Sequence, residues 1–253
     1  MPLKIVVLVK QVPDHEAMVQ VQSEERLEIE NRYVCSFFDE IAVEAALAIK
    51  KSNPDAELVA LSAGGKRAVE ALRRAVAMGI DQVEQVGDEA LEDADSLYTA
   101  AVLAARLKQL GPDLILAGKQ AGHDDMAAVG PMVAALMEIP HVSAVVSLEI
   151  EGEKAVIGRA LEGEIRTLES GLPLLVTAEK GLAEPHVPVV TRVMKAMKAK
   201  IENIAVDSVD TGGIESGGRL RRIKYFEPPK RPPVVMVDDV PALVSELEKR
   251  GAL

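Results

Sequence analysis

Polar residues and glycines gather directly after an apolar run in the middle of the chain. Residues 113–117 read DLILA, and residues 118–131 continue as GKQAGHDDMAAVGP, with glycines, a histidine, two aspartates and a proline. Glycine lets the backbone approach a ligand closely, and the amides at the N-terminus of a following helix direct partial positive charge at an anion. This stretch is therefore a candidate phosphate-binding loop.

Two further apolar runs end in comparable turns. Residues 8–14 read LVKQVPD, and residues 62–66 read SAGGK. Each turn alone is weak evidence, because neither the G-x-G-x-x-G nor the G-x-x-x-x-G-K-[ST] pattern of nucleotide-binding loops occurs. Together the three turns predict one phosphate-sized pocket.

Other kinds of chemistry have little support in the sequence. His123, Asp124 and Asp125 are adjacent rather than spaced along one helix face, so we expect no metal site. The chain contains no G-x-S-x-G pattern, and its single cysteine, Cys35, precedes a predicted helix without an evident base. We therefore expect no catalytic residue.

Helix capping is the alternative explanation for some of these polar residues. Asp125 is as well placed to cap the helix that contains Leu136 as to bind a ligand, with Pro131 near the first turn of that helix. Ser36, three residues before Asp39, is likewise a suitable N-cap. The sequence leaves these alternatives open.

Short apolar runs alternate with segments of helical periodicity over the first 140 residues. The runs cover residues 4–9, 57–63, 82–86 and 113–117. Between the first two runs, apolar residues recur on one helical face, at Ile41, Ala45 and Ile49. Such alternation predicts an α/β fold with a parallel sheet and helices on both faces, whose ligands bind at the carboxyl ends of the strands.

After about residue 140 the pattern changes. Residues 141–170 alternate around the turn-like EGEK and EGE, which predicts antiparallel strands added to one side of the sheet, and residues 172–178 restore a buried strand. Turn and extended-backbone residues then dominate until a short predicted helix near residues 240–250. We therefore expect a domain over residues 1–204 and an extended arm over residues 205–253 that packs on a partner subunit.

Charge and composition narrow the class of partner. A formal net charge of −11 disfavours contact with a nucleic acid backbone. Charged residues interrupt the apolar runs well before the roughly twenty residues of a membrane span, so we expect a chain that does not cross a membrane. A single cysteine fits a reducing compartment, and we expect a cytoplasmic protein.

Long stretches spread over nearly the whole chain share the pattern of one family. They are KIVVLVKQVPD (4–14), FDEIAVEAAL (38–47), LSAGGKRAVEALRRAVAMGID (61–81), GKQAGHDD (118–125) with VGPM (129–132), R-x-x-E-G-E (159–164), LPLLVTA (172–178) and RVMKAMKAKIE (192–202). Together they resemble the β subunit of the electron transfer flavoproteins.

The resemblance implies a Rossmann-like domain that buries an adenine nucleotide, usually AMP, in the turns after its strands. Main-chain amides near Gln120, Ala121 and Val129 would hold its phosphate. Carried over position by position, the resemblance places the nucleotide at Leu8, Ser36, Phe37, Phe38, Asp39, Ala63, Gly118, Lys119, Gln120, Ala121, Gly122, His123, Asp124, Asp125, Met126, Ala127, Ala128 and Val129.

The resemblance also implies the partners. The redox FAD lies mainly in an α subunit, flavin-containing dehydrogenases donate electrons in transient encounters, and a quinone-linked or other oxidoreductase accepts them. The flavin ring then carries the chemistry, and this chain supplies position and docking. The resemblance places His15 near the partner's flavin and Val190 at the position of an apolar docking anchor; the alternative for Val190 is burial in the core.

Several residues depart from the family pattern. His123, Met126 and Ala128 replace polar or acidic residues of the loop, Ser36 replaces an asparagine, and Arg166 replaces Glu or Gln. These changes remove polar side chains from the loop, so the resemblance leaves both AMP and a second FAD open as the nucleotide.

A second version of the family binds another FAD in this pocket and uses NADH to split an electron pair between two acceptors. The stretch ADSLYTA (94–100) resembles those members, with Asp95, Ser96 and Thr99 available to a diphosphate. The alternative for this stretch is an ordinary capped helix start. A more remote alternative for the chain is an adenine nucleotide-binding module of the universal-stress type, which has no need of the arm after residue 205.

Overall fold

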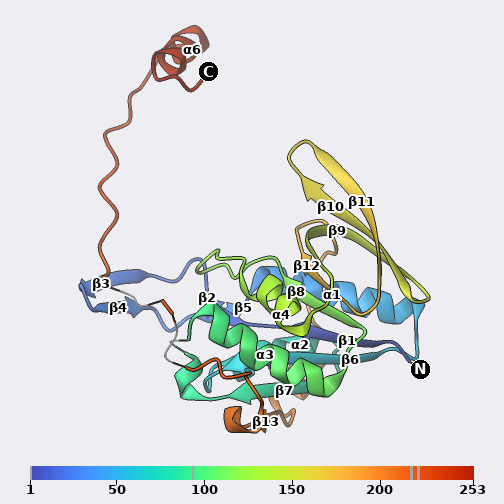
Figure 1. The fold of residues 1–253 in the computed structure, drawn as a ribbon. Coiled ribbons are helices and arrows are strands. Elements are labelled where there is room, and N and C mark those ends of the chain that lie inside the picture. Colours follow the sequence, from blue (N-terminus) through green and yellow to red (C-terminus); the bar gives the residue numbers. More distant parts are fainter. Residues whose placement is uncertain (1, 93, 217–218, 221–222) are drawn as a thin grey trace. The chain divides into compact units, whose positions relative to one another are not determined.

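The structure is a computed structural model that describes residues 2–92, 94–216, 219–220 and 223–253. It divides into two compact units, one of residues 1–19 with 29–222 and the other of residues 20–28 with 223–253 (Figure 1). The larger unit contains the loops that follow the first, second and fourth apolar runs.

A nine-stranded sheet forms the centre of the larger unit among its described residues, in the order β11-β10-β9-β12-β8-β1-β6-β7-β13 (Figure 1). Its parallel part consists of β1 (Lys4–Leu8), β6 (Glu57–Gly64), β7 (Gln82–Gly87), β8 (Leu114–Gly118), β12 (Leu174–Ala178) and β13 (Glu202–Ile204). The predicted parallel sheet is therefore confirmed.

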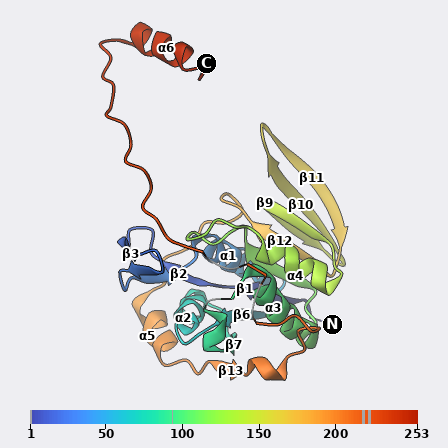
Figure 2. The same cartoon turned by 60° about the vertical axis from the view of Figure 1, so that its left-hand side comes forward.

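The added antiparallel strands are also confirmed. They are β9 (His141–Glu151), β10 (Lys154–Leu161) and β11 (Glu164–Gly171). β9 joins the sheet by pairing in parallel with β12, while β10 and β11 fold back as an antiparallel ribbon at the sheet edge (Figure 2). Tight turns at Gly152 and Gly163, both with positive φ, make these reversals possible.

Helices cover both faces of the sheet, as predicted. They are α1 (Phe37–Ser52), α2 (Ala68–Met78), α3 (Ser96–Leu110) and α4 (Val129–Met137), while α5 (Val190–Met197) packs against α2. Because side chains alternate along a strand, β1 serves two cores. Ile5 and Val7 pack in one cluster with residues of α1 and α2, whereas Val6 and Leu8 pack in the other with residues of α3 and α4.

The order of strands reverses at β1. The chain first builds β1, β6 and β7 in one direction, and it then places β8 and β12 on the opposite side of β1. Open parallel sheets bind ligands at such a reversal, beyond the carboxyl ends of the strands. The loops after β1 and β8 are therefore in the position where a ligand is expected.

Short elements complete the larger unit. β2 (Gln11–Pro13) pairs with β5 (Tyr33–Cys35), and η1 (Glu89–Leu91) and η2 (Val206–Ser208) are single 3₁₀ turns. Val209 is buried after η2 and packs in the core cluster of α3 and α4. None of the helices that the structure describes is long and apolar enough to cross a membrane.

The smaller unit joins the tip of the β3–β4 hairpin to the last part of the chain. The hairpin consists of β3 (Val19–Ser23) and β4 (Arg26–Ile29), and the amide of Tyr225 donates a hydrogen bond to the carbonyl of Glu24 at 2.8 Å. The helix predicted near residues 240–250 is confirmed as α6 (Val240–Lys249), which Asp239 caps by accepting a bond from the amide of Ala242 at 2.8 Å.

Candidate functional site

Asp39 connects the two strand ends at the reversal of the sheet. Its Oδ2 accepts a hydrogen bond from the amide of Lys10 at 2.8 Å, and its Oδ1 accepts one from the amide of Gly118 at 3.0 Å. Lys10 follows β1, Gly118 ends β8, and Asp39 lies in the first turn of α1. One carboxylate therefore fixes the start of a helix against both loops.

Burial determines the protonation of this carboxylate. Asp39 is 7% exposed, and removal from water raises its pKa to about 7, although the hydrogen bonds from Lys10 and Gly118 act in the opposite direction. The junction of the two loops therefore contains a group that titrates near neutral pH.

Residue 118 must be glycine, because Phe38 and Asp39 leave no room for a side chain there. A Cβ atom at residue 118 would lie 2.3 Å from Oδ1 of Asp39 and 2.8 Å from Cβ of Phe38. The next residue, Lys119, forms an ion pair with Glu179, and its ammonium group lies 5.3 Å from the centre of the Phe38 ring. The α1 N-terminus thus packs directly against the beginning of the loop after β8.

The middle of this loop is held by Asp124. Its Oδ2 lies 3.5 Å from Nζ of Lys10 and 3.3 Å from Nε2 of His123, and its Oδ1 accepts a hydrogen bond from the amide of Met126 at 3.2 Å. Burial lowers the pKa of His123, and the charge of Lys10 acts in the same direction. His123 is therefore neutral near pH 7, and Nζ of Lys10 is the second basic group that faces Asp124.

Asp125 does not cap the following helix, so that interpretation is wrong. α4 begins at Val129 after Ala128, which has no side-chain capping bond. Asp125 instead accepts a hydrogen bond from Nε2 of Gln120 at 2.6 Å, with its backbone at φ +51°. The carboxylate stabilises the loop itself, and the α4 amides are free of a side-chain cap.

Ser36 occupies the N-cap position of α1, as predicted, but its hydroxyl does not cap the helix. Its carbonyl accepts the amides of Asp39 and Glu40, while its Oγ is buried without a hydrogen-bond partner among the described residues. Ser62 near the end of β6 has a buried Oγ of the same kind. Buried polar groups are normally paired, so an unpaired hydroxyl beside this junction fits a site that receives a polar ligand.

Two residues that hold these loops in place were not predicted from the sequence. Lys10 supplies the amide bonded to Asp39, and its place two residues after Leu8 at a strand end was the available signal. Gln85 on β7 donates from Nε2 to the carbonyls of Gly64 at 3.0 Å and Gly65 at 2.7 Å. A polar glutamine in the apolar run QVEQV could have indicated that its side chain bonds to a neighbouring turn, here the turn after β6.

The predicted nucleotide residues meet only in part. Phe38, Asp39 and Gly118 meet directly, and Asp124 lies against Lys10, which follows Leu8 by two residues. Ala63 lies on β6 beside β1, where the amide of Val9 donates to the carbonyl of Leu61 at 3.0 Å. No hydrogen bond between described residues joins His15 to this cluster, and its imidazole lies 3.4 Å from Asp14 with its side chain 86% exposed.

The stretch ADSLYTA forms a capped helix start, as its ordinary interpretation predicts. Asp95 accepts hydrogen bonds from the amides of Tyr98 at 2.8 Å and Arg219 at 2.7 Å, and the bond from Tyr98 is the main cause of its lowered pKa. The hydroxyl of Ser96 lies 3.8 Å from the sulfur of Met126, so α3 begins beside the loop after β8. Both carboxylate oxygens of Asp95 are already engaged by the chain.

Val190 is exposed, so the alternative of burial in the core is wrong. It is 74% exposed as the first residue of α5, whose buried residues comprise Ala196 alone. The exposed apolar residues of this helix recur at helical spacing, at Val190, Val193, Met194 and Met197. α5 therefore presents an apolar stripe to solvent.

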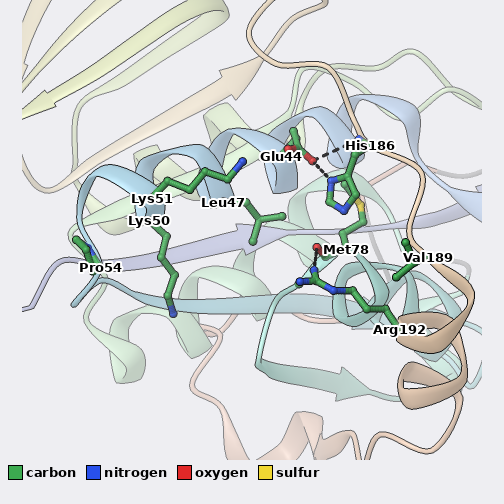
Figure 3. Close-up of a pocket in the computed structure, with 10 residues that line it drawn as sticks. Glu44, Leu47, Lys50, Lys51, Pro54, Met78, His186, Val189 and Arg192 are labelled. Carbon is green, nitrogen blue, oxygen red and sulfur yellow. Dashed lines mark hydrogen bonds and ion pairs between the residues drawn. The ribbon is translucent and has the colours of Figure 1, made fainter.

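An open groove of about 780 Å³ lies beside α5 (Figure 3). Its lining shares no residue with the predicted nucleotide site and consists of Glu44, Leu47, Lys50, Lys51, Pro54, Met78, Gly79, His186, Val189 and Arg192. The groove thus belongs to the surface around α5, and the loops at the sheet reversal form a separate site.

Comparison with known proteins agrees with this arrangement. A family model described as electron transfer flavoprotein domain matches residues 28–209. The chain is 31% identical to the electron transfer flavoprotein subunit beta of Bacillus subtilis (strain 168), over 95% of this chain and 93% of that protein. It is 35% identical to that of Megasphaera elsdenii, over 90% and 89%, and 33% identical to that of Homo sapiens, over 99% and 99%. The chain therefore belongs to the electron transfer flavoprotein family and, within it, to the β subunits.

Proposed function

We propose that this chain is the β subunit of a heterodimeric electron transfer flavoprotein, which carries electrons from flavin-containing dehydrogenases to a downstream oxidoreductase. The observation that carries the proposal is the similarity to proteins named as this subunit along almost the full length of both chains. The proposed partner is an α subunit that binds the redox FAD. FAD supplies the electron transfer, and this chain supplies the surface that positions and docks it.

We infer that the junction at Asp39 holds an adenine nucleotide, with AMP as the expected ligand. The unpaired hydroxyl of Ser36 supplies a polar group, and the uncapped start of α4 at Val129 supplies amides for a phosphate. Lys10 adds a cation at the mouth of the loop. These groups fit an anionic ligand with polar substituents, which is what a nucleotide presents.

The sequence predicts that residues 205–253 pack on the partner; Val209 packs instead in the core of this chain, and the apolar surface of residues 223–253 supports the proposal for that last part. Ile223, Phe226 and Met236 are each at least 72% exposed, and no residue of α6 is buried. Apolar surface of this extent is typical of a segment that another chain covers. The proposed cover is the α subunit.

Ligand analysis tests the proposed complex directly. We expect this chain, coexpressed with an α subunit from the same genome, to purify as a stable heterodimer that releases one AMP and one FAD on denaturation. Mass spectrometry of the intact complex and of the released ligands measures both. Two FAD per heterodimer would favour the electron-splitting version of the family, and a stable monomer without a flavin-binding partner would contradict the proposal.

We expect Val190→Ala to raise the KM for electron transfer from a flavin dehydrogenase by roughly tenfold, because truncation of an apolar anchor costs about 1–3 kcal/mol of binding. The melting temperature and flavin content should stay unchanged, since Val190 is 74% exposed. Ile165→Ala is the matched control, because Ile165 is 68% exposed and lies on β11, far along the chain from α5. Equal effects of both changes would contradict a specific anchor at residue 190.

A further inference from the structure

The segment that presents Val190 has little secondary structure of its own. Residues 184–189 form neither helix nor strand, and α5 has eight residues. An isolated helix of this length is marginal in water, so contacts with the rest of the domain must hold it. We call residues 184–197 the docking segment.

The first such contact joins the docking segment to α1. Nδ1 of His186 lies 2.5 Å from Oε2 of Glu44, and the backbone amide of His186 donates to the same oxygen at 3.4 Å (Figure 3). The side chain of Glu44 is 14% exposed, so the acceptor sits in a largely enclosed position on a rigid helix. Both the ring and the backbone of His186 are thus tied to one carboxylate.

The second contact joins the docking segment to the C-terminus of α2. Nη1 of Arg192 donates to the carbonyl of Met78 at 3.0 Å. The last turn of α2 contains no basic residue of its own, and a cation is favourable at a helix C-terminus. Arg192 therefore supplies from α5 the charge that α2 lacks.

Gly79 makes this approach of the guanidinium possible. The residue has φ +134°, a conformation that side chains rarely allow. A Cβ atom there would lie 3.0 Å from Nη1 of Arg192 and 3.3 Å from Cδ2 of Leu47. The absence of a side chain at Gly79 therefore leaves room for the guanidinium group of Arg192 to reach the carbonyl of Met78.

The two contacts lie on either side of Val190 in the sequence. We propose that Glu44 and the carbonyl of Met78 are positioning groups, which hold His186 and Arg192 so that the docking segment is ordered before a dehydrogenase binds. An ordered segment loses less conformational entropy on binding, so affinity increases without any new contact to the partner. This inference rests on the proposed function, because it concerns the docking of the same electron donor.

Hydrogen exchange of the intact heterodimer tests the contacts without any measurement of electron transfer. We expect His186→Ala and Arg192→Gln each to accelerate amide exchange in residues 187–194 by at least roughly fivefold, since local opening controls exchange. Lys195→Gln is the matched control, because it removes the same charge from α5 and Lys195 has no described bond to α1 or α2. Unchanged exchange in both variants would overturn the proposal.

Steady-state kinetics with a flavin dehydrogenase that reduces the wild-type heterodimer tests the consequence. We expect Glu44→Ala and His186→Ala each to raise KM about three- to tenfold with kcat unchanged, and the double variant to be no worse than either single one. Arg192→Gln should raise KM more than Lys195→Gln. Equal effects of these two charge changes would show that general electrostatics, rather than positioning, determines docking, and would overturn the proposal.

The two hypotheses fail in different ways. A wild-type heterodimer that accepts electrons from no flavin dehydrogenase contradicts the proposed function, while the exchange rates still report whether the contacts order the segment. An active wild type whose Glu44, His186 and Arg192 variants keep the same KM contradicts the positioning role alone.

Discussion

Gly118→Ala is expected to lower the melting temperature by roughly 5–10 °C and to remove most of the nucleotide that we propose at this junction. The added Cβ would lie 2.3 Å from Oδ1 of Asp39 and 2.9 Å from its backbone nitrogen, which is part of α1 and cannot move alone. Overpacking of this kind costs about 1–3 kcal/mol, and it displaces the loop of the proposed nucleotide site. Scanning calorimetry and quantification of the released ligand measure the two effects.

Gly122→Ala is the matched control for stability. Gly122 lies in the same loop, but a Cβ atom there would have no atom within 4 Å. The melting temperature of this variant should equal that of the wild type. If Gly118→Ala is as stable as Gly122→Ala and retains its nucleotide, the close junction between β8 and α1 does not form the site.

Asp39→Asn is expected to change the dependence of stability on pH. The pKa of Asp39 is raised from 3.8 to about 7 in the folded chain, so the stability that it contributes is complete below about pH 4 and is lost as the pH rises towards 7. Between pH 5 and 8 this loss amounts to about 3 kcal/mol. Because asparagine does not ionise, the melting temperature of the variant should rise relative to the wild type by roughly 5–10 °C over that range.

The comparison must separate ionisation from a lost hydrogen bond. The amide group of asparagine has one acceptor oxygen, so the bond from either Lys10 or Gly118 is lost at every pH, at a cost of about 1–3 kcal/mol. Asp113→Asn provides the control, because Asp113 accepts the amide of Lys4 at the other end of β1 at 2.8 Å. If the melting temperatures of Asp39→Asn and wild type differ by the same amount at every pH from 5 to 8, Asp39 does not titrate in this range.

Local patterns were enough to predict the elements and much of their order. Apolar runs separated by helical periodicity predicted the strands β1, β6, β7 and β8 and the helices α1, α2 and α3 between them, because burial on two faces requires such runs. The turn-like EGEK and EGE predicted the reversals between β9, β10 and β11. The exposure of Val190 agrees with the apolar docking anchor that the resemblance implies at this position.

Helix capping was predicted less well than the strands and helices, because a short polar side chain can either cap a helix or form a bond within a loop. Asp125 and Asp95 both precede helices, yet Asp95 caps α3 while Asp125 bonds to Gln120 within its loop. Ser36 has the position of a cap without the side-chain bond. Which role a short polar side chain takes depends on the backbone path of the loop, and that path is set by packing rather than by spacing in the sequence.

The sequence by itself determined that permissive turns follow three strands, because glycine content and helix starts are local properties, and it predicted a phosphate ligand for these turns. Only the tertiary structure decided that two of these turns meet. The carboxylate of Asp39 bonds to Gly118, which is 79 residues away, because the sheet places β8 directly beside β1. That adjacency depends on strand order, and the raised pKa of Asp39 depends on the burial that it produces. Neither property can be read from the spacing of residues along the chain, since both arise from contacts between distant segments.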